Sequence, residues 1–297
     1  MAFTPMLRLE YRNFSWWVAQ ASHPTFHRLA FTWGSVVWVV NGFAAFLPFC
    51  NSHFEKAAHS TGWTAFLGAT IFEIGSVLGI LEYWNRDEVR NSRRKGTGSK
   101  SEGEGDIESQ ASERHLTAPN VPPLSSETHL EDEKPKAGRD RTTKRKDIVW
   151  FSTDTRYFRQ LAWYGTFFQL LAASIFWISG FTAIPPIQSA IEENTPLIRG
   201  TYWAPQVIGG SGFIISATFL MLAAQDVWWK PKPLSIGWQV GVWNFIGGMG
   251  FMLSGAFGFP SSHWAEYQSA LTTFWGGWAF LIGSIFQWYG SVNPDSK

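Results

Sequence analysis

Glu73 is the residue of this chain whose chemistry most needs an explanation. It is the only charged residue between Lys56 and Glu82, in a stretch that is otherwise apolar enough to cross a membrane. A carboxyl group inside an apolar span is costly, so it should face other helices and either find a partner or carry a proton. Glu73 is therefore the leading candidate for a functional group.

Three neutral amides could meet Glu73 inside the membrane, namely Asn41, Gln169 and Asn244. With a helical rise of about 1.5 Å per residue, Glu73, Gln169 and Asn244 lie roughly 13 Å from the expected inner ends of their spans, and Asn41 roughly 18 Å. Similar depths allow one polar cluster of four side chains. Such a cluster would bind a proton or a cation during transport, or its hydrogen bonds would only hold the helices together. Both interpretations stay open.

The other reactive side chains form no recognisable catalytic or metal-binding pattern. Cys50, His53 and His59 follow the first span, but their spacing matches no established template for a metal site. The sequence shows neither a nucleophile with a matching base nor a glycine-rich phosphate loop followed by lysine. We therefore predict that the chain is not an enzyme and holds no metal or cofactor.

Charge is distributed unevenly over the elements that must position these residues. Residues 85–149 hold 27 of the 47 charged residues and no Phe, Trp or Tyr, whereas the remaining 232 residues carry only 20 charges. A soluble domain has about a quarter of its residues charged, which excludes that class for the remainder. The single cysteine, Cys50, excludes a disulfide-rich secreted scaffold. The near balance of basic and acidic residues argues against nucleic acid as a partner.

Six apolar stretches are each long enough for a transmembrane helix, which needs about 20 mostly apolar residues. They lack the polar face that a helix on the surface of a soluble protein shows. The sequence therefore predicts an all-α fold, a six-span transmembrane helix bundle in a lipid bilayer. The expected spans are 29–49, 60–82, 160–184, 204–225, 235–258 and 268–290.

The chain then divides into four regions. Residues 1–28 are an N-terminal segment, 29–84 a first two-helix membrane unit, 85–149 a charged loop, and 150–297 a four-helix membrane unit with a short tail. Basic residues favour the cytoplasmic side, and 22 of the 24 lie on the side of both termini and the loop. We expect a multi-pass protein with cytoplasmic N- and C-termini, in the plasma membrane or an endomembrane.

The loop at 85–149 is predicted to be disordered, because it is polar, rich in charge and without apolar periodicity. Its two ends are basic, so it could contact anionic lipids or recruit proteins. It also contains candidate phosphate acceptors, Ser92, Ser101, Ser109 and Ser112.

The six spans can be aligned as three similar two-helix hairpins. All three would start on the same side of the membrane, which makes them parallel repeats, and transporters are often built from repeats. In the first helices, an aromatic residue precedes Asn or Ser by three positions, at Trp38, Phe176 and Phe251. In the second helices, the aromatic residues Phe72, Phe213 and Phe280 align, as do the glycines Gly68, Gly209 and Gly276.

The second helices of the first and third hairpins carry GWTAF from Gly62, FEIGSVL from Phe72 and WGGWAFLIGSI from Trp275. These segments resemble the YrhK-like domain, a two-helix membrane hairpin with a Trp-to-Ile-Gly-Ser pattern in its second helix. The overall layout is similar to that of uncharacterised integral membrane proteins of fungi. The middle hairpin departs from the pattern, with Ser216-Ala217 in place of Gly-Ser. The resemblance implies a membrane architecture and transfers no activity.

Two functional classes follow from the sequence. The first is a transporter-like or channel-like protein whose site is the cluster around Glu73. The alternative is a non-transporting membrane scaffold whose loop at 85–149 recruits partners or lipids. The sequence predicts neither the oligomeric state nor the transported substrate.

Overall fold

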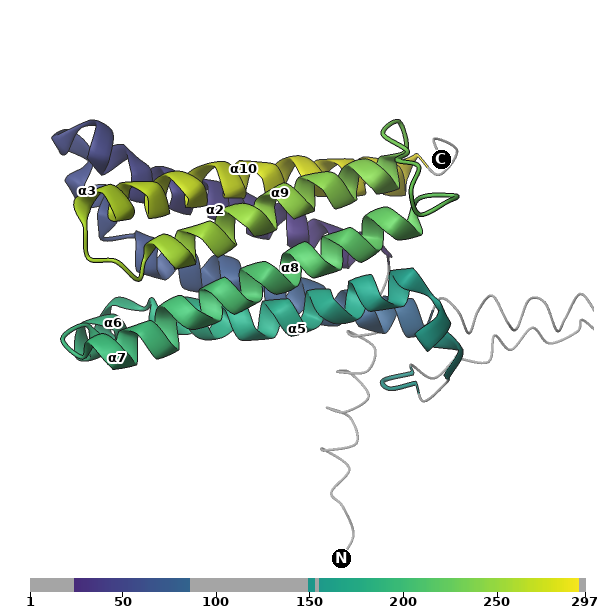
Figure 1. Cartoon of the computed structure of the whole chain (residues 1–297), viewed down its shortest axis with the longest axis horizontal. Helices are drawn as coiled ribbons and strands as arrows, with labels where there is room; N and C mark the ends of the chain where they lie inside the picture. The colour runs from purple at the N-terminus through teal and green to yellow at the C-terminus, as the bar shows by residue number, and fades with distance from the viewer. Residues whose placement is uncertain (1–23, 86–148, 153–154, 294–297) are drawn as a thin grey trace, which may run out of the picture. The chain divides into compact units, whose positions relative to one another are not determined.

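The computed structural model describes residues 24–85, 149–152 and 155–293 of the chain. Within these ranges there is no strand, and six long helices are each long and apolar enough to cross a membrane. This confirms the prediction of an all-α, six-span bundle (Figure 1). The long helices are α2 (Pro24–Cys50), the helix Thr61–Asn85, α5 (Leu161–Thr182), α8 (Ala204–Ala223), α9 (Ile236–Phe257) and α10 (His263–Val292).

Most of the N-terminal segment 1–28 and nearly all of the loop at 85–149 lie outside the described residues. The predictions of disorder, of lipid or protein recruitment and of phosphate acceptors at Ser92, Ser101, Ser109 and Ser112 fall there. The described residues up to Trp84 and those from Val149 onward belong to one compact unit.

Short helical elements connect the long helices at one end of the bundle, which we name the pocket end. It lies at the left of Figure 1, opposite the connection between α8 and α9. Proline opens two of these elements at a position where its missing N–H costs nothing. The elements are η1 (Ser52–Phe54), α3 (Glu55–Ala58), α6 (Pro185–Ile191), α7 (Thr195–Ile198) and the π-turn η3 (Arg199–Trp203), while η2 (Thr155–Arg159) precedes α5 at the other end.

Two helices begin five residues before their predicted spans, α2 at Pro24 instead of residue 29 and α10 at His263 instead of residue 268. In α10, the charged residue Glu266 lies before the predicted start of the span and inside the observed helix. A carboxylate in the first turn of a helix is instead favourable, because it faces the positive end of the helix dipole. Ser262 also caps the helix, since its side chain accepts a hydrogen bond from the backbone N–H of Ala265 at 3.3 Å.

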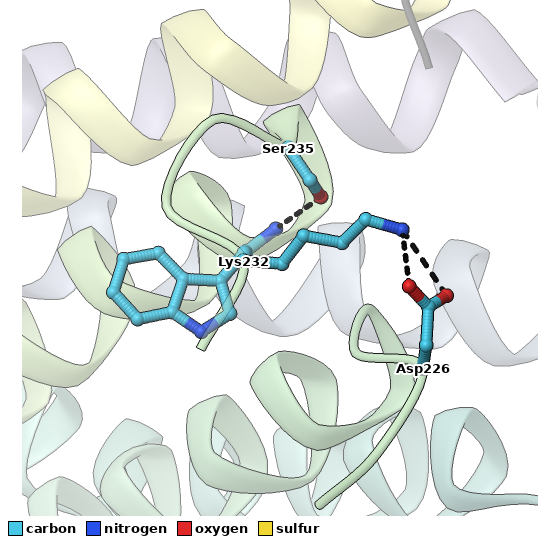
Figure 2. A network of polar contacts seen from close by, with 4 residues as sticks. Asp226, Lys232 and Ser235 are labelled. Carbon is cyan, nitrogen blue, oxygen red and sulfur yellow. Dashed lines mark hydrogen bonds and ion pairs between the residues drawn. The ribbon is translucent and has the colours of Figure 1, made fainter. Parts of the chain in front are cut away.

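Two local contacts order the connection between α8 and α9 (Figure 2). Lys232 Nζ lies 3.1 and 3.0 Å from the carboxylate oxygens of Asp226, and Ser235 accepts a hydrogen bond from the backbone N–H of Trp238. The ion pair is exposed, so its contribution to stability is about 0–1 kcal/mol. Trp228 and Trp229 in this connection are also exposed, and indole rings are enriched at membrane–water interfaces.

The six long helices close into a ring through positions with very small side chains. A β-carbon added to Gly180 of α5 would come within 2.6 Å of Ala69, and one added to Gly210 of α8 within 2.5 Å of the Met252 backbone nitrogen. Gly277 of α10 closes the ring against the backbone of α2. Such positions let helices approach closely in lipid, where packing replaces the hydrophobic effect between helices. Around the ring the order is α2, Thr61–Asn85, α5, α8, α9 and α10.

One buried aromatic ring from each long helix meets at the centre of the bundle. We name these six residues the aromatic core, and they include the positions that the repeat alignment placed in register. Each of them is at most 4% exposed. The aromatic core consists of Trp38, Phe72, Phe176, Phe213, Phe251 and Phe280.

The ring contacts of the aromatic core form two triangles, one from the first helices and one from the second helices, joined pairwise within each hairpin. The three rings of the first helices touch one another with centroids 4.6–5.5 Å apart. The three rings of the second helices do the same at 5.4–6.3 Å. Each ring also touches its partner in its own hairpin, at 5.1–6.5 Å. The three hairpins are therefore related by an approximate three-fold axis through the aromatic core, which supports the alignment into repeats.

The aligned glycines explain how each hairpin admits its first aromatic ring. A β-carbon on Gly68 would lie 2.8 Å from the Trp38 indole, and one on Gly209 2.7 Å from Phe176. Gly276 makes the same contact with Phe251 at 3.1 Å. The glycine on the second helix thus leaves room for the ring of the first helix in all three hairpins.

A pocket on the axis of the bundle as the candidate functional site

A cavity of about 380 Å³ lies on the pocket-end side of the aromatic core. All six long helices contribute to its lining, and so do residues of α3, α6 and the π-turn η3. Trp38 and Phe176 of the aromatic core lie at its base. The volume is within the usual range for sites that bind small molecules, about 300–1,000 Å³. We name this cavity the axial pocket.

The repeats explain why the axial pocket lies where it does. Asn41, Ser179 and Ser254 follow the first-helix rings by three positions, and all three line the pocket. The positions eleven, ten and seven residues before the second-helix rings also line it in every hairpin. They are Thr61, Tyr202 and Ser269, then Gly62, Trp203 and Ala270, and then Ala65, Gln206 and Thr273. One set of equivalent positions therefore surrounds the axis, and these side chains do not fill it.

Ser254 is the centre of a buried polar network on one side of the pocket. Gln206 Nε2 donates a hydrogen bond to Ser254 Oγ at 2.9 Å, and Ser254 Oγ lies 2.7 Å from Thr273 Oγ1. Ser179 Oγ reaches Gln206 Oε1 at 3.5 Å. Gln206, Ser179 and Ser254 are at most 8% exposed. Satisfied networks of this kind hold side chains in one geometry, as a binding site requires.

Asn41 is the one predicted site residue that lines the axial pocket. Its side-chain nitrogen donates to the backbone oxygen of Thr61 at 2.7 Å and to Thr64 Oγ1 at 2.9 Å. These contacts join α2 to the start of the next helix. Asn41 Oδ1 accepts no hydrogen bond from the described residues.

Glu73 lies outside the pocket lining, at the contact between the helix Thr61–Asn85 and α5. Ser174 Oγ donates a hydrogen bond to its Oε1 at 2.9 Å. Its Oε2 is buried and has no hydrogen-bond partner among the described residues. The Trp177 indole donates to Thr70 at the same contact, so this face joins the first hairpin to the second.

Gln169 and Asn244 occupy the same repeat position, seven residues before Phe176 and Phe251 and on the other side of the aromatic core from the pocket. Gln169 Oε1 accepts a hydrogen bond from Ser216 Oγ at 3.1 Å. Asn244 Oδ1 lies against Gly283, where an added β-carbon would be 2.9 Å away. In the described structure no hydrogen bond joins any two of Asn41, Glu73, Gln169 and Asn244. Each has its contacts at a different place in the bundle, and a shared functional role stays a prediction.

A buried pair at the end opposite the pocket was not foreseen. His27 Nδ1 lies 2.5 Å from Glu82 Oε2, with the two side chains 11% and 8% exposed. His27 Nε2 is also 3.5 Å from the Gln287 side chain. The two residues lie 55 positions apart in the chain, so the sequence carries no local signal of their pairing.

Within the described ranges, no three His, Cys, Asp or Glu side chains are grouped as a metal site would require. Cys50 is exposed.

No family model, curated protein or solved structure matches this chain. The resemblance of the hairpins to the YrhK-like domain therefore stays a prediction. The architecture that the structure does establish is a six-span, all-α membrane bundle with a pocket on its axis.

Proposed function

We propose that this protein is a transporter-like membrane protein that takes a small solute into the axial pocket. The observation that carries the proposal is the position of the pocket, on the approximate three-fold axis and lined by all six long helices. Transporters built from repeats bind substrate where the repeats meet, because small movements of the repeats then change access to the site.

The aromatic core favours a carrier over an open channel. Its six rings occupy the axis next to the pocket, with every neighbouring pair of centroids within 6.5 Å. A solute could pass only if the hairpins moved apart and separated these rings. With the predicted cytoplasmic termini, the pocket would accept solute from the opposite side of the membrane.

Glu73 fits this proposal as a proton or cation site that couples movement of the hairpins to transport. It lies between the first and second hairpins, and one of its carboxylate oxygens is buried without a described partner. An ionisable group in a membrane span is a functional candidate by default. Because Glu73 does not line the pocket, we assign it a role in coupling and not in direct contact with the solute.

The scaffold alternative depends on the loop at 85–149, nearly all of which lies outside the described residues. No contact in the described part of the chain favours it over transport.

The test is uptake into liposomes that contain the purified protein. Radiolabelled choline, glucose, alanine and succinate would be offered one at a time, with and without a pH gradient. We expect uptake of at least one solute above that of empty liposomes, and loss of that uptake in the double variant Gln206→Ala and Ser254→Ala.

Ser211→Ala is the matched control, because Ser211 lies on α8 with Gln206 but bonds only to the backbone of its own helix. Uptake by wild type that the double variant retains would remove the pocket from the mechanism. Absence of uptake by a correctly folded wild type for all four solutes would count against transport.

A further inference from the structure

The charge of the axial pocket indicates which kind of solute it accepts. Glu266 is the only charged residue among the described residues that line it, and no Lys, Arg or His is found there. Glu266 is exposed in the first turn of α10, at the mouth of the pocket. An anion in the pocket would be repelled by the Glu266 carboxylate, with no positive side chain to offset the repulsion. A cation would be attracted by the same carboxylate.

The connections between helices around the mouth of the pocket also carry a net negative charge. Residues 51–60, 183–203 and 258–266 contain four acidic residues (Glu55, Glu192, Glu193, Glu266) and two basic residues (Lys56, Arg199), a difference of −2. Clustered charge of one sign raises the local concentration of ions of the opposite sign. The approach to the pocket therefore favours cations as well.

Aromatic side chains supply the second part of the argument. Five of them line the cavity, two at its base and three nearer the mouth. Aromatic faces attract ammonium groups through their negative quadrupole, and desolvated sites make this attraction stronger. The five are Trp38, Phe49, Phe176, Tyr202 and Trp203.

The polar groups of the lining are the third part. The side-chain nitrogens of Asn41 and Gln206 already donate to protein oxygens. Asn41 Oδ1 is left as an acceptor, so it suits a solute that carries a donor such as O–H or N–H.

We infer that the axial pocket binds a small organic cation, an alkylammonium compound with a hydrogen-bond donor. The inference rests on the proposed function in taking the axial pocket as the solute site. It adds the chemical class of the solute, which neither the fold nor the repeats specify.

The test compares choline with 3,3-dimethylbutan-1-ol, which has the same shape but a carbon in place of the charged nitrogen. Binding to the purified protein in lipid nanodiscs would be measured by calorimetry and by tryptophan fluorescence. We expect choline to bind about tenfold more tightly than the neutral compound, as cation–π attraction in a partly dry site implies. Equal or tighter binding of the neutral compound would overturn the inference.

Glu266→Gln tests the carboxylate, and Glu192→Gln is its control on the same end of the bundle. Glu192 is exposed and does not line the pocket. We expect Glu266→Gln to weaken choline binding about threefold to tenfold, with less effect at high salt, and Glu192→Gln to leave it unchanged. Equal effects of both substitutions would show general surface attraction only and would contradict a specific role for the pocket.

The same protein separates the two proposals. Choline that binds in nanodiscs but is not taken up by liposomes, when no other solute is taken up either, would support a cation site and reject transport. Uptake of glucose, alanine or succinate that choline does not inhibit would support transport and reject the cation.

Discussion

The aromatic core and the axial pocket lie next to each other on the same axis, yet the same repeats produce opposite results in them. In the aromatic core all three hairpins supply large apolar rings, and the axis is filled. In the pocket the equivalent positions carry different, mostly smaller and polar residues, such as Asn41, Ser179 and Ser254, and the axis stays open. The residues that are alike in the three hairpins thus pack the bundle together. The residues that differ between the hairpins leave a cavity that could bind a solute.

The same contrast separates Glu73 and the His27–Glu82 pair from the rest of the bundle. Both occur in the first hairpin only, since Ile214 and Leu281 stand at the positions equivalent to Glu73. Charges that break the symmetry are not required by the repeated packing. They are therefore the first places to look for functions beyond it.

The largest expected effect is in the aromatic core. Phe251→Ala removes a ring that touches three others of the core, and we expect a loss of about 3–5 kcal/mol of stability from the cavity it leaves. Trp33→Ala is the control, because Trp33 is 64% exposed on the outside of the bundle. Unfolding by SDS in mixed micelles measures both. Similar losses for the two variants would mean that the aromatic core does not hold the repeats together.

A somewhat smaller loss is expected when the buried pair is broken. His27→Ala removes the histidine partner of the buried Glu82 side chain, and breaking a buried pair from one side costs about 3 kcal/mol. The exposed Asp226–Lys232 pair is the comparison, because Asp226→Ala should cost about 0–1 kcal/mol. The same unfolding measurement applies. A His27→Ala protein as stable as wild type would show that the pair does not stabilise this end of the bundle.

The polar network of the pocket should matter less for stability than for binding. Ser254→Ala leaves Gln206 Nε2 without its acceptor, at a cost of about 1–2 kcal/mol. We expect a larger relative change in solute affinity, measured by calorimetry in nanodiscs. If stability fell as far as in Phe251→Ala with affinity unchanged, pocket and core would not differ in role.

Glu73→Gln is expected to have the smallest effect on folding. Glutamine keeps a side-chain oxygen that can accept the hydrogen bond from Ser174, so stability should change by about 0.5 kcal/mol or less. Uptake driven by a pH gradient should be lost if Glu73 carries the coupling proton, while solute binding to the pocket persists. Unchanged uptake would mean that Glu73 only forms a hydrogen bond between helices and has no role in transport.

The six spans, the three hairpins and the registers of Trp38, Gly68 and Phe72 with their equivalents can be predicted from the amino-acid sequence alone. These are properties of apolar length and of periodic small and aromatic residues, which the local chain encodes directly. The sequence also shows Asn41 as a polar residue in a span, but it groups Asn41 with Glu73 by depth alone.

Which polar residues face the axis depends on how the helices pack, and the sequence pattern does not show it. Depth along a helix gives one coordinate, whereas the rotation of each helix about its own axis depends on packing against its neighbours. That rotation places Asn41 with Ser179 and Ser254 in the pocket, and Glu73 with Ser174 at a contact between hairpins. It also brings His27 to Glu82. The pocket itself exists because the side chains at its level, many of them Gly, Ala, Ser or Thr, leave the axis unfilled, and this follows from the assembled ring of helices only.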